Sequence, residues 1–276
     1  MARAAERIGI AQPALSQQIR ALEEALGFKL FHRRKRGIDL TTAGQAYRQS
    51  AARLITMHQE AALSARMTAR GELGHLAIGY VPSALFSREF PQVLHRLQSE
   101  LPGIVLELRE GQINDLSRDL SDGRIDIALL RAPVRPADGQ EQLLLAPRPL
   151  LVALPQDHPL AERKSVVLAD LADLPMVSYN DPTDVGIMQV VGRLAERNGV
   201  TLDVCWTVST MTGILGLVAA GFGFGIVPAG LDQLHPDRIL FVPLAEPEAQ
   251  AGLCYVWRRD AALPALDRFL ALVRTG

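Results

Sequence analysis

Apolar residues between positions 11 and 27 recur at steps of three and four, which is the spacing of one helical face. Pro13 stands in the first turn, where a helix needs no N–H donor, and Gly27 suits the left-handed residue that ends a helix. The pattern therefore predicts an amphipathic helix over residues 11–27. Its apolar stripe is Ala14, Leu15, Ile19, Leu22 and Leu26.

Short elements flank this helix on both sides. Residues 2–8 form a second short apolar-faced segment, and a turn at residues 9–11 joins the two into a helix-turn-helix. Residues 28–31 and 38–40 predict two strands around a basic turn, which is the shape of a wing. Taken alone, the helix also fits an ordinary surface helix, and the turn fits a solvated loop.

Polar side chains on the exposed face of the main helix suit contact with duplex DNA. Gln12, Ser16, Gln17 and Arg20 lie outside the apolar stripe, and their amide, hydroxyl and guanidinium groups can bind base edges and phosphates. The turn that follows carries four consecutive cations, which predict a phosphate clamp. These cations are Arg33, Arg34, Lys35 and Arg36.

A long helix is predicted over residues 41–70. Thr42 and Gln45 have the spacing of a capping box, with Thr41 as an alternative cap. Apolar and small residues then follow a heptad spacing that favours a partner helix over a single helix lying on its own domain. The heptad positions are Tyr47, Ala51, Leu54, His58, Ala61 and Ala65.

From Gly74 onward the pattern alternates between strands and helices. This β-α-β order predicts parallel sheets with helices on both faces, in two lobes joined by crossing strands. Strands are expected at residues 75–81, 104–109, 125–130, 150–154, 176–179, 202–207, 224–227, 239–242 and 252–257. Helices are expected at residues 83–98, 113–120, 168–171, 185–198, 210–220 and 264–274.

Polar residues follow several of these strands, at the edge where such sheets bind ligands. Arg131 directly follows a buried strand and suits a carboxylate, with an ion pair to a neighbouring acid as the alternative. Ser83, Ser209 and Thr210 stand at helix starts, where they also fit simple capping.

Charge is distributed unevenly along the chain. The 276 residues carry a net charge of −1, but residues 1–70 contain 12 Lys and Arg against 5 Asp and Glu. A basic head on an acidic body favours nucleic-acid contact at one end only.

Cys205 and Cys254 lie in apolar runs, so we expect two buried free thiols in the cytoplasm. No signal peptide is indicated, because the charges at Arg3, Glu6 and Arg7 are followed by no apolar core. No membrane span is indicated either, because the longest apolar run, residues 214–227, is interrupted by glycines.

Nothing in the sequence favours an enzyme, a metal site or a cofactor. Ser83 lies outside a G-x-S-x-G motif, and the histidines lack the spacing of metal ligands. Gly221, Gly223 and Gly225 follow a helix and precede a strand, which is the wrong order for a dinucleotide loop.

The chain resembles the LysR-type transcriptional regulators. The residues that carry the resemblance are RAAERIGIAQPALSQQIRALEEALGFKLF and RRKRGIDLTTAGQAY near the start, and LSDGRIDIALL, DHPLA, DLADLP and LVAAGFGFGIVP further on. Two positions depart from the family pattern: Ala11 replaces a Ser or Thr cap, and Gln17 replaces a frequent basic residue. Family members also carry a further helix before the segment that starts here, so we expect an upstream start or a shortened product.

The resemblance implies an α/β protein with an N-terminal winged helix-turn-helix, its first helix missing, over residues 1–41. It further implies a linker and dimerisation helix over residues 42–72 and a two-lobed effector domain, similar to periplasmic binding proteins, over residues 73–276. Lobe I is expected at about residues 73–148 and 244–276, and lobe II at about residues 149–243. The VPSAL segment resembles members that sense aromatic acids or dicarboxylates.

The resemblance also implies roles for individual residues. Gln12, Pro13, Ser16 and Gln17 would face bases, while Arg20 and the Arg33–Arg36 run would hold phosphates. The implied effector contacts are Ser83, Gln112, Arg131, Thr183, Ser209 and Thr210.

We therefore expect an effector-responsive DNA-binding regulator without a cofactor, working as a homodimer or homotetramer in the cytoplasm. Its expected partners are duplex promoter DNA and a small anionic effector, with RNA polymerase as a candidate. The alternative is a ligand sensor like a solute-binding protein, with impaired or no DNA binding.

Overall fold

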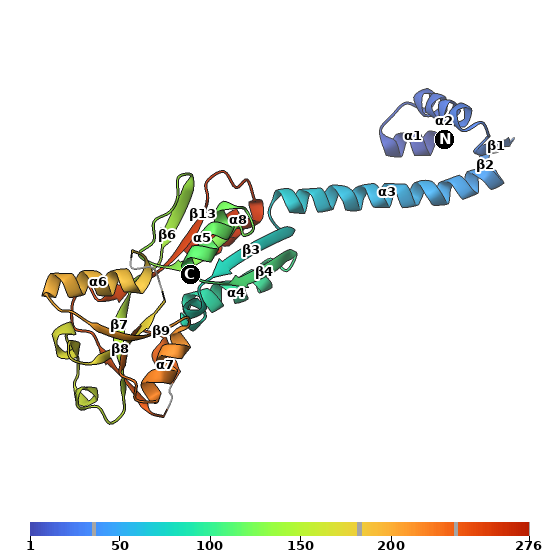
Figure 1. Ribbon diagram of the computed structural model, residues 1–276. Helices are drawn as coiled ribbons and strands as arrows, with labels where there is room; N and C mark the ends of the chain where they lie inside the picture. Colours follow the sequence, from blue (N-terminus) through green and yellow to red (C-terminus); the bar gives the residue numbers. More distant parts are fainter. Residues whose placement is uncertain (35–36, 181–183, 235–236, 276) are drawn as a thin grey trace. The chain divides into compact units, whose positions relative to one another are not determined.

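Two separately packed units, Met1–Arg66 and Met67–Gly276, make up the chain in the computed structural model. The structure describes residues 1–34, 37–180, 184–234 and 237–275 (Figure 1).

The first unit opens with the two predicted helices, α1 (Ala2–Ile8) and α2 (Gln12–Leu26). Each ends on a left-handed glycine, Gly9 and Gly27, both with a φ of 77°, because only glycine adopts this conformation without steric cost. No side-chain hydrogen bond caps α2, since its first flanking residue is Ala11.

The wing consists of β1 (Phe31–Arg34) and β2 (Gly37–Leu40), which pair antiparallel. The prediction of a strand at residues 28–31 was wrong by three positions. The buried Glu23 carboxylate explains the shift, because it accepts hydrogen bonds from the backbone N–H of Leu30 at 2.8 Å and of Phe31 at 3.2 Å. The segment before Phe31 is therefore held by a helix side chain instead of a partner strand.

A single long helix, α3 (Thr42–Ala69), follows the wing. The Thr41 hydroxyl accepts a hydrogen bond from the Gly44 N–H at 2.7 Å and donates one to the Lys29 carbonyl at 2.7 Å. The preferred capping box of Thr42 and Gln45 was therefore wrong, and Thr41 is the cap. Four large apolar side chains of α3 are exposed within this chain: Leu54, Ile55, Met57 and Leu63.

The second unit has two lobes, each built around its own sheet (Figure 1). In lobe I the strand order is β4-β3-β5-β13-β6. Strands β4, β3 and β5 are parallel, and β13 runs antiparallel to both of its neighbours, β5 and β6. All five residues of β5 are buried, which shows that both faces of this sheet are covered. Lobe I contains β3 (Gly74–Tyr80), a 3₁₀-helix (Pro82–Phe86), α4 (Glu89–Glu100), β4 (Ile104–Glu110), α5 (Ile113–Ser121), β5 (Ile127–Arg131), β6 (Gln140–Leu144), β13 (Leu253–Arg258) and α8 (Pro264–Arg274).

In lobe II the strand order is β11-β7-β10-β8-β9, and β12 pairs with β7. Strands β10, β8 and β9 are parallel as predicted, whereas β7 runs antiparallel to both of its neighbours, β10 and β11. Lobe II contains β7 (Arg148–Pro155), β8 (Pro175–Tyr179), α6 (Gly186–Asn198), β9 (Asp203–Val208), α7 (Met211–Ala219), β10 (Phe224–Pro228), β11 (Ile239–Pro243), β12 (Gln250–Ala251), and 3₁₀-helices at Pro159–Glu162, Leu168–Leu171 and Leu231–Gln233.

Three further predictions differ from the structure. The helix expected at residues 83–98 is interrupted, because the Ser87 hydroxyl accepts the Phe90 N–H at 3.2 Å and starts a new helix there. Strand β6 was missed. Cys205 is exposed, because it lies on β9 at the edge of its sheet, whereas Cys254 is buried as expected.

No helix among the described residues has the length and hydropathy needed to cross a membrane.

Candidate functional site

The predicted base-reading residues lie together on the first half of α2. Gln12, Pro13, Gln17 and Arg20 are exposed, and Ser16 is partly buried. Arg20 has no hydrogen bond or ion pair within the described part of the chain, so its guanidinium is available to a ligand.

The basic wing residues fall largely outside the described structure. The backbone of Arg33 and Arg34 belongs to β1, but their side chains, and the whole of Lys35 and Arg36, lie outside the described residues. Their predicted phosphate contacts therefore stay predictions.

Two of the predicted effector contacts are joined in the structure. Arg131 ends β5, is 5% exposed, and donates from Nη2 to the Ser83 hydroxyl at 2.9 Å and to the Ser83 carbonyl at 3.4 Å. Ser83 is also buried and lies in the 3₁₀-helix that follows β3. The pairing places a cation and a hydroxyl at the carboxyl ends of two neighbouring parallel strands.

Arg131 and Ser83 line a cavity of about 280 Å³ between the two lobes. Lobe I supplies Arg88 and Glu89 as well, and lobe II supplies Arg148, Asp232 and Gln233. Three arginines against two acids make the lining suited to an anion.

Contacts across the cavity hold the lobes close together. Arg148 pairs with Glu89, and the hydrogen bond and charge of Arg148 lower the pKa of the Glu89 carboxyl despite its partial burial. Gly230 has a φ of 113°, and a Cβ there would lie 2.5 Å from the carbonyl oxygen of Phe86. Glycine is therefore required where the lobe II segment approaches the lobe I 3₁₀-helix.

Three other predicted effector contacts, Gln112, Ser209 and Thr210, do not line this cavity. Gln112 flanks the start of α5 and is partly buried. Ser209 and Thr210 are exposed, and the Thr210 hydroxyl accepts the Gly213 N–H at 3.0 Å, which is the capping alternative. Thr183 lies outside the described residues.

Arg88, Glu89 and Arg148 were missed as cavity residues. Sequence spacing gives no signal for them, because Arg148 and Glu89 are 59 positions apart and meet only after the lobes pack. No cluster of three metal-ligating side chains occurs in the part of the chain that the structure describes.

Two family models cover most of the chain. The LysR substrate binding domain matches residues 69–276, and the bacterial regulatory helix-turn-helix protein of the lysR family matches residues 1–45. The chain belongs to the LysR family of transcriptional regulators. This confirms the resemblance, and the family's members are DNA-binding regulators with an effector domain, not enzymes.

Known proteins resemble this LysR-type regulator along most or nearly all of its length. The uncharacterized regulator YnfL of Escherichia coli K12 is 34% identical over 97% of this chain and 90% of its own length. The structure of full-length CbnR complexed with its target DNA has a TM-score of 0.83 at 27% identity, covering 99% of this chain and 93% of CbnR. The BenM effector-binding domain with its effector benzoate has a TM-score of 0.64 at 26% identity, covering 73% of this chain and 91% of that domain.

These matches give no support to the alternative of a solute-binding sensor without DNA binding. The helix-turn-helix model matches from the first residue to position 45, and the predicted α1, α2 and wing are all present in that range.

Proposed function

We propose that the cavity between the lobes is the effector site of this LysR-type regulator, with Arg131 and Ser83 as central contacts. One observation carries the proposal: a buried guanidinium at a strand end, held by a buried hydroxyl, faces a cavity formed by both lobes. A guanidinium in such surroundings favours a carboxylate, because its donors match two carboxylate oxygens.

The proposed effector is a small aromatic acid or dicarboxylate. The volume of about 280 Å³ limits the ligand to a small molecule, and the likeness to BenM, whose effector is benzoate, supports an aromatic carboxylate. Gln112, Ser209 and Thr210 are candidate contacts for a ligand that extends beyond this cavity, and Thr183 stays a predicted contact.

For DNA, we propose that Gln12, Pro13, Ser16 and Gln17 face bases while the cations hold phosphates. The exposure of α2 and the absence of a partner for Arg20 among the described residues support this division. The phosphate contacts are Arg20, Arg33, Arg34, Lys35 and Arg36.

The proposed working form is a dimer or tetramer in the cytoplasm, with RNA polymerase as a candidate partner at the promoter. The exposed apolar side chains of α3 support self-association, because a partner helix would remove exposed leucine and isoleucine side chains from water.

The effector proposal is tested by calorimetric titration of the full chain with benzoate and with succinate. We expect Arg131→Gln to weaken binding of the active acid by about tenfold or more, since it removes a charge-assisted contact. Ser83→Ala, a smaller change, should weaken it less, and both variants should retain DNA affinity.

Arg274→Gln is the matched control, because Arg274 is exposed on α8 and does not line this cavity. The site assignment is wrong if Arg131→Gln binds the acid as well as the unchanged chain does. The effector class is wrong if neither acid, nor a wider panel of aromatic acids and dicarboxylates, raises the unfolding temperature.

A further inference from the structure

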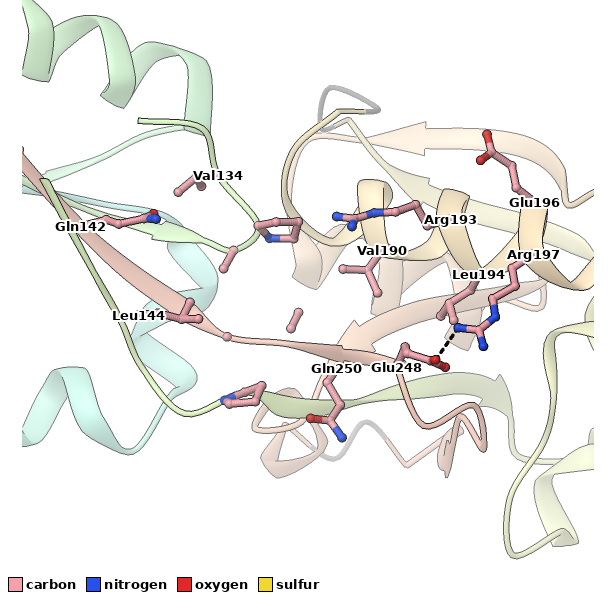
Figure 2. A pocket seen from close by; sticks show the side chains of 15 residues that line it. Val134, Gln142, Leu144, Val190, Arg193, Leu194, Glu196, Arg197, Glu248 and Gln250 are labelled. Atoms are coloured by element: carbon pink, nitrogen blue, oxygen red, sulfur yellow. Dashed lines mark hydrogen bonds and ion pairs between the residues drawn. The ribbon is translucent and has the colours of Figure 1, made fainter. Parts of the chain in front are cut away.

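A second and larger hollow lies between the lobes, with a volume of about 810 Å³. Figure 2 shows it lined by α6 of lobe II on one side and by β6 and the segment after β5 of lobe I on the other. The crossover segments at Pro147 and at Gln250–Gly252 also line it. This volume falls within the range of pockets that hold small organic ligands.

The two hollows share no lining residue, yet they use neighbouring positions of the same segments. Arg131, Leu145, Arg148 and Leu253 line the smaller cavity, whereas the residue next to each lines the larger one. These neighbours are Ala132, Leu144, Pro147 and Gly252. Because successive residues of an extended chain point to opposite sides, the hollows lie on opposite sides of the segments that join the lobes.

The walls of the larger hollow are mainly apolar. Val190 and Leu194 of α6 contribute buried side chains from lobe II, and Val134 and Leu144 contribute from lobe I. Leu144 is 60% exposed although it faces this hollow, so an apolar ligand there would remove unfavourable water contact.

One cation in the hollow has no partner. Arg193 makes no hydrogen bond or ion pair within the described residues, whereas its neighbour Arg197 on α6 is paired with Glu248. Figure 2 shows the Arg193 guanidinium and the Gln142 amide pointing into the hollow from opposite walls, while the Glu196 carboxylate points away. The hollow thus combines apolar walls with one guanidinium that has no ion-pair partner among the described residues.

We infer that this hollow is a second ligand site, which binds a small organic anion with an apolar body. Arg193 holds the anionic group, Gln142 and Gln250 supply amide hydrogen bonds, and the apolar body lies on Val190 and Leu194. The occupant is a small molecule because one guanidinium without an ion-pair partner among the described residues points into a hollow of ligand size. Since both lobes form its walls, a bound anion would favour one angle between them.

The test is calorimetric titration of the full chain with 2-naphthoate and with its neutral counterpart 2-naphthamide. We expect saturable binding of 2-naphthoate that Arg193→Gln weakens by about tenfold, with little change for 2-naphthamide. Because Arg193 is exposed and has no partner in the described part of the chain, we expect its replacement to leave the fold intact. Arg274→Gln, an equal change of charge on α8, should have no effect.

Ser83→Ala separates this site from the proposed effector site. If 2-naphthoate affinity falls with Ser83→Ala and not with Arg193→Gln, the anion binds in the smaller cavity, and this inference fails while the proposed function stands. If 2-naphthoate does not bind, or if Arg193→Gln and the control Arg274→Gln bind it with the same affinity, the second site is refuted.

Sedimentation velocity tests the remaining occupant, a second copy of this chain. We expect the oligomer to be the same with and without saturating 2-naphthoate, and in Arg193→Gln. Dissociation of the oligomer in either case would show that the hollow is an interface between copies, and the inference would be overturned.

Discussion

Single residues set the local geometry of the DNA-binding unit, and Glu23 is the clearest case. In the sequence it is one of two adjacent acids on an amphipathic helix, which would normally be solvated. In the structure it is buried and accepts hydrogen bonds from the backbone of Leu30 and Phe31 and from the Lys29 ammonium. These bonds, the one from the Leu30 N–H foremost, lower the pKa of its carboxyl from the usual 4.5.

A lowered pKa makes the contribution of Glu23 dependent on pH. The ionised form is favoured in the folded state, so its stabilisation is present above about pH 4.5 and is lost as the pH falls through the lowered pKa. We expect Glu23→Gln to lower the unfolding temperature of the full chain at pH 7, with the difference shrinking below pH 4.5. Calorimetry at both pH values measures this.

Glu24→Gln is the control, because Glu24 is exposed on the same helix. If Glu23→Gln lowers the unfolding temperature by the same amount at both pH values, the stabilisation by Glu23 does not depend on its ionisation, and this prediction is wrong.

At the scale of elements, the predicted boundaries of helices and strands agree with the structure where a residue at the boundary itself determines them. Helix α2 ends at Gly27 as predicted because glycine alone accepts that φ readily. The start of β1 and the cap of α3 were missed because contacts between elements decide them. Gly44 illustrates this, since a Cβ there would lie 2.0 Å from the Leu30 carbonyl oxygen. No local sequence pattern predicts that these two residues, 14 positions apart, lie so close together.

Helix α2 carries the proposed division between base and phosphate contacts. We expect Ser16→Ala to relax sequence preference, reducing discrimination between the operator and an altered site by about 1 kcal/mol or more. Arg20→Ala should instead weaken binding to all duplexes alike and lower the salt slope by about 1. Fluorescence anisotropy with two duplexes over a range of salt concentrations measures both effects.

Arg20 is suited to this comparison because it has no intramolecular partner to lose among the described residues. If Ser16→Ala and Arg20→Ala lose sequence preference equally, the proposed division between base and phosphate contacts is wrong.

At the scale of the whole molecule, function depends on surfaces that the chain does not cover by itself. Helix α3 buries only Gly44 and leaves Leu54, Ile55 and Met57 exposed, on and beside the predicted heptad face. The two lobes of the second unit have separate cores, so a ligand between them can act on their relative angle without disrupting either core.

Self-association through α3 is open to a direct test. We expect Leu54→Glu to shift the oligomer toward monomer at micromolar concentration and to weaken operator binding by tenfold or more, because a charge enters an apolar seam. Analytical ultracentrifugation and anisotropy measure the two effects. Gln49→Glu adds the same charge on the opposite face of α3 and should change neither, and an unaltered oligomer in Leu54→Glu would refute the seam.

The sequence by itself determined the helix-turn-helix, the long linker helix, the alternation of strands and helices and the family, because these follow from periodicity, turn residues and motifs within short stretches. It also pointed to Ser83 and Arg131, since each follows a strand. Only the tertiary structure decided that these two meet in one cavity, that Arg148 and Glu89 pair across it, and that Arg193 faces a second hollow. Such features join residues far apart in the chain, and their positions depend on how two lobes pack, which local pattern does not encode.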